Sequence, residues 1–298
     1  MFAFATMPAR PRILILGAAG GLGKALTRRL AALGEVIAWS RHDLDLSQLE
    51  DIPKKLDAQA FDVLLNPAGM TSPDVCEVEP DLAKIVNVDA PAALAASCHR
   101  LDRRFIHFST DYVFDGSKTT PWSEDDPTEP VNHYGRTKRD GEIAVLKANA
   151  QALVARVSWL FGPDKASHPD HIITKALQGT ALNAIADKTS SPTFTHDLCD
   201  WITRLLTHHP EVSGPLHLCH QGTASWQEWG QEALRVAEDM GLPFQTRSIE
   251  PLRLADSTFF KAARPPHTTM STARLTQLTG IQPRAWQEAL REYLHGRM

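Results

Sequence analysis

Short apolar runs alternate with segments of helical periodicity over the first half of the chain. Residues 12–16 form a continuous aliphatic run, which a strand buried on both faces needs. Residues 22–33 carry apolar side chains at helical spacing and end at Gly34, a typical helix C-cap. The same alternation predicts strands at 36–39, 61–65, 104–108 and 153–157, and helices at 80–100 and 134–148. This order predicts an α/β fold with a doubly wound parallel sheet of the Rossmann type.

The regular alternation ends near Gly162. Beyond it, prolines, histidines and short predicted helices (197–206, 226–240 and 286–294) alternate with loops. We therefore expect a nucleotide-binding domain over residues 1–162, into which later segments can recross. Residues 163–298 are expected to form a smaller α/β substrate lobe.

Composition narrows the partners and the compartment. The chain has 298 residues and a formal net charge of −4, which gives no electrostatic reason to expect nucleic acid or an anionic membrane. No stretch approaches the roughly 20 apolar residues that cross a bilayer. The four cysteines are scattered, so free thiols in a reducing, cytoplasmic setting are expected. Residues 1–6 are apolar but lack a basic region, and are expected to be a frayed leader.

A glycine-rich turn follows the first predicted strand and opens the first helix. Its residues are Gly17, Gly20, Gly21, Leu22 and Gly23. Glycines at this spacing permit a tight turn, close approach of a pyrophosphate and close packing of the helix. The helix N-terminus then offers unpaired N–H groups to phosphate oxygens. In this strand–turn–helix context, the pattern predicts a dinucleotide-binding site.

The end of the second strand bears on the choice of cofactor. It ends in Ser40 and Arg41, with no carboxylate before Asp43. An acidic residue here would bind the ribose 2′-hydroxyl of NADH, whereas an arginine suits the 2′-phosphate of NADPH. Arg41 therefore favours NADPH, with NADH possible and a solvated surface arginine as the alternative. Asp45 and Leu46 follow at a suitable distance to contact the adenine.

A phenol and an ammonium group are placed one helical turn apart. Tyr134 and Lys138 stand at i and i+4 on the same helix face. Reduction of a carbonyl leaves an alkoxide that needs a proton, and a nearby lysine lowers the pKa of a tyrosine. Ser109 and Thr110 follow a predicted buried strand, at whose carboxyl end ligands bind in open α/β sheets. The Thr110 hydroxyl can donate to a substrate carbonyl there.

These motifs resemble the extended short-chain dehydrogenase/reductase superfamily, and within it the dTDP-4-dehydrorhamnose reductase family. The resemblance covers nearly the whole chain and rests on 109–116, 134–138, 156–162, 191–193, 214–218 and 264–265. It implies hydride transfer from NADPH to C4 of a 4-keto-6-deoxy sugar attached to a nucleotide.

The resemblance also implies roles for individual residues. Tyr134 is the expected proton donor, Lys138 its pKa-lowering partner and the anchor of the cofactor ribose, and Thr110 the group that polarises the carbonyl. Further cofactor contacts are expected from Ala68, Gly69 and Thr71 in the loop 66–71, and from Ser109. The expected substrate residues are Asp111, Tyr112 and Trp159, with Arg264 on the nucleotide diphosphate.

The chain departs from the family pattern at several positions. The loop 66–71 carries a proline and Met70 where members have alanine and an aromatic or histidine ring. Lys188 replaces a glutamine, and Ala25 replaces the acidic residue that binds Mg²⁺ at a dimer contact in some members. No metal site is expected, and a monomer and a homodimer both remain open. Trp226 and Trp229 are expected to pack in the core.

Two other functions fit the same motifs. One is a non-catalytic NADP-binding regulatory subunit, which would resemble the β subunit of methionine adenosyltransferase. The other is a reductase or epimerase of a different nucleotide sugar. An epimerase regenerates its nicotinamide in each cycle, so net oxidation of the cofactor separates it from a reductase.

Overall fold

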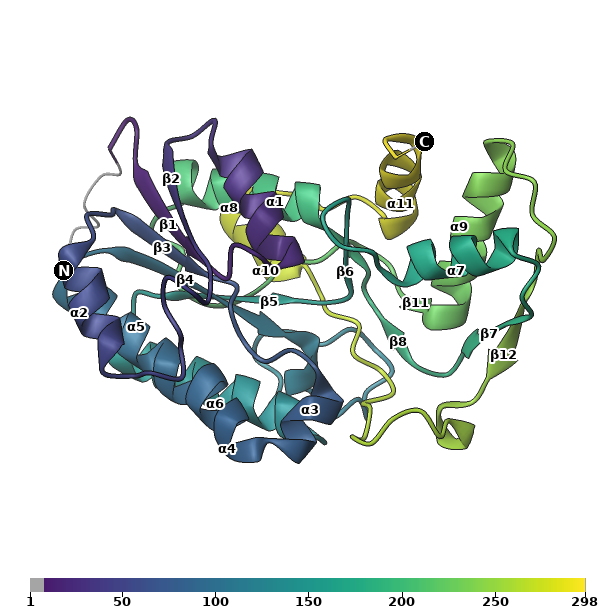
Figure 1. Cartoon of the computed structure of the whole chain (residues 1–298), viewed down its shortest axis with the longest axis horizontal. Helices are drawn as coiled ribbons and strands as arrows, with labels where there is room; N and C mark the ends of the chain where they lie inside the picture. The colour runs from purple at the N-terminus through teal and green to yellow at the C-terminus, as the bar shows by residue number, and fades with distance from the viewer. Residues whose placement is uncertain (1–7, 298) are drawn as a thin grey trace.

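A parallel sheet of six strands forms the centre of the molecule. The computed structural model describes residues 8–297 (Figure 1); the expected leader at 1–6 lies outside them. The strands, in the order β10-β5-β4-β3-β1-β2, are β1 (Arg12–Leu16), β2 (Glu35–Trp39), β3 (Val63–Asn66), β4 (Arg104–Thr110), β5 (Leu153–Val157) and β10 (Gly214–His217). All neighbouring strands in it are parallel. The predicted fold class is confirmed.

Helices cover both faces of this sheet, because successive side chains of a strand point to opposite faces. Ile13 and Ile15 of β1 pack with one set of helices, and Leu14 and Leu16 pack with the other. The first set is α1 (Gly21–Leu30), α8 (Thr195–His208) and α10 (Ala273–Thr279), and the second is α2 (Asp51–Ala58), α5 (Ala90–Arg100) and α6 (His133–Ala148). Figure 1 shows the two sets above and below the sheet.

The segment predicted as one helix over 80–100 contains a change of helix type. It consists of α4 (Pro80–Lys84), a π-helical turn (Ile85–Asp89) and α5. A π turn inserts an extra residue into the helix and often lies at a functional site. The turn includes the buried Asn87, whose contacts are described below. A second short helix, α3 (Pro73–Val78), lies beside α6.

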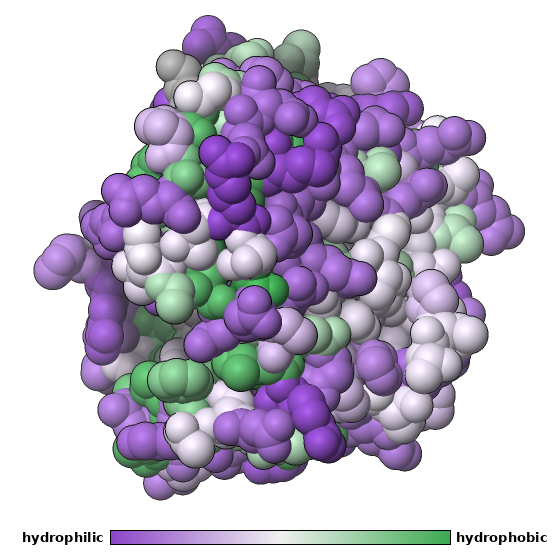
Figure 2. Space-filling model, turned by 90° about the vertical axis from the view of Figure 1, so that its right-hand side faces the viewer, coloured by the Kyte–Doolittle hydropathy of each residue, from purple (hydrophilic) through white to green (hydrophobic). Residues whose placement is uncertain are grey.

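The smaller lobe stands at the right of Figure 1. Its helices are α7 (His168–Leu177), α9 (Trp226–Asp239) and α11 (Trp286–His295). Strands β7 (Leu182–Ile185) and β12 (Ile249–Leu252) pair in parallel. Two further short pairs are β6 (Leu160–Phe161) with β9 (Thr193–Phe194), and β8 (Thr189–Ser190) with β11 (Ala224–Ser225). Figure 2 shows polar residues over most of the outward face of the lobe, with apolar residues in separate patches.

Two segments of the second half return to the central sheet, one with α8 and β10 and the other with α10. Strand β10 pairs with β5, with Gly214 opposite Leu153, and α8 packs on α1. The boundary near residue 162 therefore stays a prediction, to which these returning elements must be added. No helix within residues 8–297 has the length and apolar character that a membrane crossing requires.

The strand order reverses between β1 and β3. The chain leaves β1 toward β2 on one side and returns to β3 on the other. Open α/β sheets bind ligands in the crevice outside the carboxyl ends of the strands at such a point. The site is therefore expected beyond Leu16 and Asn66.

Candidate active site

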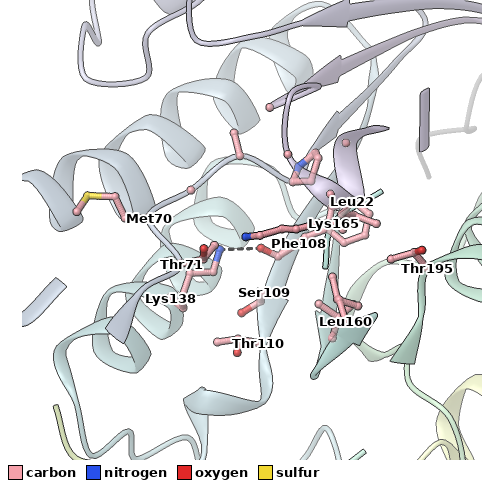
Figure 3. Close-up of a pocket in the computed structure, with 18 of the residues that line it drawn as sticks. Leu22, Met70, Thr71, Phe108, Ser109, Thr110, Lys138, Leu160, Lys165 and Thr195 are labelled. Atoms are coloured by element: carbon pink, nitrogen blue, oxygen red, sulfur yellow. Dashed lines mark hydrogen bonds between the residues drawn. The ribbon is translucent and has the colours of Figure 1, made fainter. Parts of the chain in front are cut away.

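A pocket of about 740 Å³ lies beyond the carboxyl ends of β1, β3 and β4. This volume is within the range of small-molecule and cofactor sites. Both lobes contribute to its wall, and residues from both are visible in Figure 3. All the predicted site residues line it except Arg264: Gly17, Gly20, Gly21, Leu22, Gly23, Arg41, Asp45, Leu46, Ala68, Gly69, Thr71, Ser109, Thr110, Asp111, Tyr112, Tyr134, Lys138 and Trp159.

The glycine turn has geometry that side chains would block. Gly17 has φ +62°, and a Cβ there would lie 3.0 Å from the Cα of Ala68. A Cβ on Gly23 would lie 2.2 Å from the carbonyl oxygen of Gly17. Helix α1 begins at Gly21 with no side-chain cap and no acidic residue in its first turn. Its first N–H groups are therefore open to an anion.

The residues around this turn fit a dinucleotide cofactor. The turn is closely packed at Gly17 and Gly23, whereas a Cβ on Gly20 would meet only the Gly17 carbonyl oxygen, at 3.3 Å. A glycine turn of this kind lets a pyrophosphate approach the main chain closely. The Ser109 hydroxyl is buried at the pocket without a hydrogen-bond partner among the described residues. A buried polar atom without a partner is costly, so a ligand group that bonds it would be stabilised.

Arg41 follows β2 and lines the pocket. Its side chain is 76% exposed, and its Nε lies 3.1 Å from an oxygen of Asp45. The guanidinium keeps further N–H donors, which suit a phosphate. The neighbouring Asp45 carboxylate is bonded by Ser47 as well.

Asn87 fixes the loop after β3. Its Oδ1 accepts from the Met70 N–H at 2.9 Å, and its Nδ2 donates to the Met70 carbonyl at 3.0 Å. Nδ2 also donates to Thr137 on α6. This buried amide holds the loop that carries Ala68, Gly69 and Thr71. Sequence reasoning missed Asn87, because helical periodicity over 80–100 does not reveal a π turn.

Tyr134, Thr110 and Lys138 lie together at the end of β4. The Asn132 side chain accepts from the Gly135 N–H and so caps the N-terminus of α6, where Tyr134 lies. The Lys138 ammonium donates to the Phe108 carbonyl at 2.7 Å, as Figure 3 shows. Thr110 donates to Asp111 at 3.1 Å and accepts from the Tyr112 N–H.

Burial dominates the pKa values of this group. It raises the pKa of Tyr134, which a hydrogen bond with Thr110 opposes only in part. Burial lowers the pKa of Lys138 to about 8, against an opposing effect of Glu142. The expected lowering of the Tyr134 pKa by Lys138 is therefore not seen. The physical reason is that desolvation of the buried phenol dominates and the Asp111 charge raises the pKa further, while only the hydrogen bond with Thr110 lowers it.

Aromatic rings form the wall on the side of the smaller lobe. Trp159 stacks on Trp226 and Trp229, with ring centroids 5.4 and 5.6 Å apart. Trp159 also has φ +40°, a strained conformation for a residue with a bulky side chain. Trp229 is buried in the core as expected, but it and Trp226 line the pocket too. Tyr112 adds a ring that meets Tyr134 edge-on at 5.6 Å.

A buried lysine stands behind this aromatic wall. Lys188 Nζ donates to the Pro265 carbonyl at 2.7 Å. The ammonium lies 4.9 Å from the Tyr112 ring centroid and 5.8 Å from that of Trp159, within the range of cation–π attraction. Burial lowers the pKa of Lys188 to about 8. The sequence signalled this residue only as a departure from the family's glutamine.

Asp111 connects the end of β4 to the smaller lobe. Its carboxylate accepts from Ser190 at 2.8 Å and from Thr268 at 2.6 Å, besides Thr110. These donors hold the buried carboxylate in one orientation. Asp111 therefore positions Thr110, although it also lies at the pocket surface.

Arg264 is committed to a protein partner. Its guanidinium lies 2.8 Å from an Asp74 carboxylate oxygen and is 6% exposed. The other Asp74 oxygen accepts from the N–H groups of Lys261 and Ala262. This ion pair connects the loop 261–264 to α3 of the larger lobe. Its partners are far apart in sequence, so no local pattern could reveal it.

One histidine and one cysteine lie close to the pocket. His168 lies 2.7 Å from the Trp226 carbonyl. Within residues 8–297 no group of three or more His, Cys, Asp or Glu is arranged to hold a metal. All four cysteines are free thiols. Burial raises the pKa of Cys76 to about 11, so this thiol near the site stays protonated.

The family of the chain follows from comparison with known proteins. The family described as RmlD substrate binding domain matches residues 11–297. The chain belongs to this family. A Streptomyces antibioticus relative, a probable dTDP-4,6-dihydroxy-2-methyloxan-3-one 4-ketoreductase, is 38% identical over 94% of both chains. The Escherichia coli dTDP-4-dehydrorhamnose reductase is 30% identical over 95% of this chain and 97% of its own.

A solved member of the family shares the fold. The dTDP-4-dehydrorhamnose reductase of Bacillus anthracis, solved in complex with NADP, superposes with a TM-score of 0.89. It is 25% identical, over 96% of this chain and 99% of its own. The prediction of an oxidoreductase of the dTDP-4-dehydrorhamnose reductase family is thereby confirmed.

Proposed function

We propose that the protein is an NADPH-dependent reductase that acts on the C4 keto group of a nucleotide-linked 4-keto-6-deoxy sugar. The names of its relatives favour a dTDP-linked sugar. The observation that carries the proposal is one pocket that contains the glycine turn, Thr110, Tyr134 and Lys138. The turn supplies a cofactor site, and the three side chains supply the groups that a carbonyl reduction needs.

One side of the pocket would bind the cofactor and the other would bind the sugar. The glycine turn and the N-terminus of α1 would hold the cofactor diphosphate, with Ser109 and the loop 66–71 beside the nicotinamide half. The second ribose would lie toward Arg41. NADPH, when bound, supplies the hydride. The aromatic wall of Tyr112 and Trp159 would then flank the sugar.

Thr110 and Tyr134 act on the substrate oxygen. On binding of the sugar, the Thr110 hydroxyl would turn its single proton from Asp111 to the keto oxygen, so that negative charge developing there is stabilised. Tyr134 then gives its phenolic proton to this oxygen. The raised pKa of Tyr134 keeps the phenol protonated at neutral pH, the state in which it can donate.

Lys138 acts after the proton has left. Its ammonium lies on the same face of α6 as Tyr134 and carries a positive charge below a pKa of about 8. Although burial sets the pKa of Tyr134 in this structure, a cation on this face would offset part of the charge of the phenolate that remains on Tyr134. Lys138 is also the expected anchor of the nicotinamide ribose.

Replacement of Tyr134 tests the proposal. Purified protein is given NADPH and dTDP-4-keto-6-deoxy sugars, and NADPH oxidation is followed. Tyr134→Phe keeps the ring but loses the proton, so kcat is expected to fall by about 100-fold or more. The dissociation constant of NADPH should change little. Tyr293→Phe, which removes a hydroxyl bonded to Asp170 and away from the pocket, is the matched control.

Product analysis separates the proposal from the other functions. A reductase consumes one NADPH for each sugar reduced. Conversion of a sugar without net oxidation of NADPH would indicate an epimerase. Binding of NADPH without turnover on any keto sugar, together with a stoichiometric partner, would indicate a regulatory subunit.

A further inference from the structure

Two buried side chains behind Lys138 have no part in the chemistry described so far. His107 on β4 and Asn66 at the end of β3 are both inaccessible to solvent. The Nε2 of His107 lies 3.4 Å from the Lys138 ammonium, and its Nδ1 lies 3.2 Å from the Asn66 side-chain nitrogen. The three residues form a row that ends at the pocket.

The protons that each group carries restrict the hydrogen bonds that Asn66, His107 and Lys138 can form. Burial keeps the pKa of His107 well below its usual value, so the ring is neutral and carries one proton. A proton on Nε2 would face the ammonium, which has donors only. The Nε2 of His107 must therefore be the acceptor while Lys138 is charged. The proton of the ring then sits on Nδ1.

The Asn66 side-chain amide is compatible with this tautomer of His107 when its oxygen and nitrogen exchange positions. A protonated Nδ1 needs an acceptor, yet the side-chain nitrogen of Asn66 is turned toward it. The amide oxygen Oδ1 is buried and has no partner among the described residues. The two ends of an amide have the same shape, and the hydrogen-bond network decides between them. Turned by 180°, the oxygen accepts the Nδ1 proton of His107.

We propose that His107 is a positioning residue for Lys138: held by Asn66 as the Nδ1–H tautomer, it accepts a hydrogen bond from the ammonium. This inference rests on the proposed function for its consequence, but its geometry is independent of the substrate. Two ammonium donors are then bound, one by the Phe108 carbonyl and one by His107. The third is left for the pocket, where Tyr134 and the cofactor ribose are expected.

Other charged groups around Lys138 do not replace this bond. Glu142, one turn further along α6, is bonded by Arg156 from β5 at 2.7 Å. Cys76 on α3 stays a neutral thiol, because burial raises its pKa. Tyr134 is a neutral phenol. Among these groups, His107 is the one that lies within hydrogen-bond distance of the Lys138 ammonium.

The first test reads the tautomer in the whole protein. Proton–nitrogen correlation spectra of histidine-labelled protein at pH 7 distinguish a protonated Nδ1 from a protonated Nε2. The His107 signals are assigned by their loss in His107→Gln. A proton on Nδ1 is the expected result. A proton on Nε2 at pH 7 overturns the proposal, whatever the enzyme proves to reduce.

The second test measures the pKa of the Lys138 ammonium. Nitrogen spectra of lysine-labelled protein follow the titration of Lys138 and of Lys188, which is buried elsewhere and serves as an internal control. His107→Leu removes the acceptor and should lower the Lys138 pKa by about one unit, since a hydrogen bond to a charged group is lost. Lys188 should not move. His107→Gln offers an amide oxygen near the position of Nε2 and should restore most of the shift.

Activity then connects the bond to the reaction. If the reductase proposal holds, kcat/KM falls at high pH as Lys138 loses its proton. In His107→Leu this fall should begin at a lower pH, by the same number of pH units as the shift of the Lys138 pKa. An unchanged Lys138 pKa in His107→Leu contradicts the positioning role even in an active enzyme. A shifted pKa in a protein that reduces no keto sugar would sink the proposed function and leave this inference standing.

Discussion

The two sides of the pocket are built by different means. On the side where we propose the cofactor, the turns that follow β1 and β3 approach one another closely, as at Gly17 and Ala68. On the substrate side, side chains from segments far apart in sequence meet: Tyr112, Trp159 and Lys188. The first side depends on backbone geometry, and the second depends on packing and charge.

The two buried lysines show the same contrast. Lys138 donates to a strand carbonyl of the central sheet, and Lys188 donates to a loop carbonyl of the smaller lobe. Burial lowers the pKa of each to about 8. Lys138 faces the expected position of the cofactor, whereas Lys188 lies behind rings that line the substrate side. On the proposed function, similar burial would therefore serve different parts of the reaction.

The largest effect is expected from a substitution in the glycine turn. Gly23→Ala would place a Cβ 2.2 Å from the Gly17 carbonyl oxygen, so the turn or α1 must move. The dissociation constant of NADPH, measured by fluorescence titration, should rise by about 100-fold or more. Gly296→Ala, whose Cβ would come no closer than 3.4 Å to its neighbours, is the control. Equal effects of the two variants would show that the turn does not hold the cofactor.

The next effect is expected where Asp74 binds Arg264. Asp74→Asn keeps the shape but removes the charge beside a guanidinium that is 6% exposed. The free energy of unfolding should fall by about 2–3 kcal/mol, because a buried charge loses its partner. Urea denaturation measures it. Asp51→Asn breaks an exposed pair with Lys54 and should cost less than about 1 kcal/mol. An equal loss of unfolding free energy in both variants would show that the Asp74–Arg264 pair stabilises the fold no more than an exposed pair does.

A substitution of Lys188 should affect binding of the sugar without affecting binding of NADPH. Lys188→Met removes the charge behind Tyr112 and Trp159 while keeping a long side chain. The KM for the nucleotide sugar should rise by about 10-fold, from the loss of cation–π contacts. The NADPH dissociation constant should stay within about twofold. A variant that weakens NADPH and leaves the sugar unaffected would reverse our assignment of the sides.

Arg41 is expected to give the smallest effect, because its side chain is 76% exposed. Arg41→Ala should weaken NADPH by about fivefold and leave NADH unchanged, since only NADPH carries the 2′-phosphate. Arg100→Ala, an exposed arginine paired with Asp57 outside the pocket, is the control. If NADPH and NADH weaken equally, Arg41 has no part in the choice between them.

The larger lobe could be predicted from sequence because its signals are local. The aliphatic run at 12–16 is β1 without change of bounds, and the helix expected at 134–148 is α6 with one residue added. The glycine spacing placed the turn, and the spacing of Tyr134 and Lys138 placed them on one face of a helix. Each of these depends on neighbours within a few positions.

The remaining features depend on contacts that periodicity does not encode. The π turn that brings Asn87 to Met70 is one extra residue inside an otherwise regular helix. The Asp74–Arg264 pair joins residues 190 positions apart. Lys188 reads as a polar residue in a polar run, yet tertiary packing buries it completely. The raised pKa of Tyr134 likewise comes from burial, which i and i+4 spacing cannot reveal.

The fate of the hydride tests the account most directly. NADPH carrying deuterium at C4 of the nicotinamide is incubated with the protein and a dTDP-4-keto-6-deoxy sugar, and the product is examined by NMR and mass spectrometry. We expect one deuterium on C4 of the sugar for each NADPH oxidised. Product without deuterium at that carbon, or oxidation of NADPH that leaves the sugar unreduced, would contradict the account.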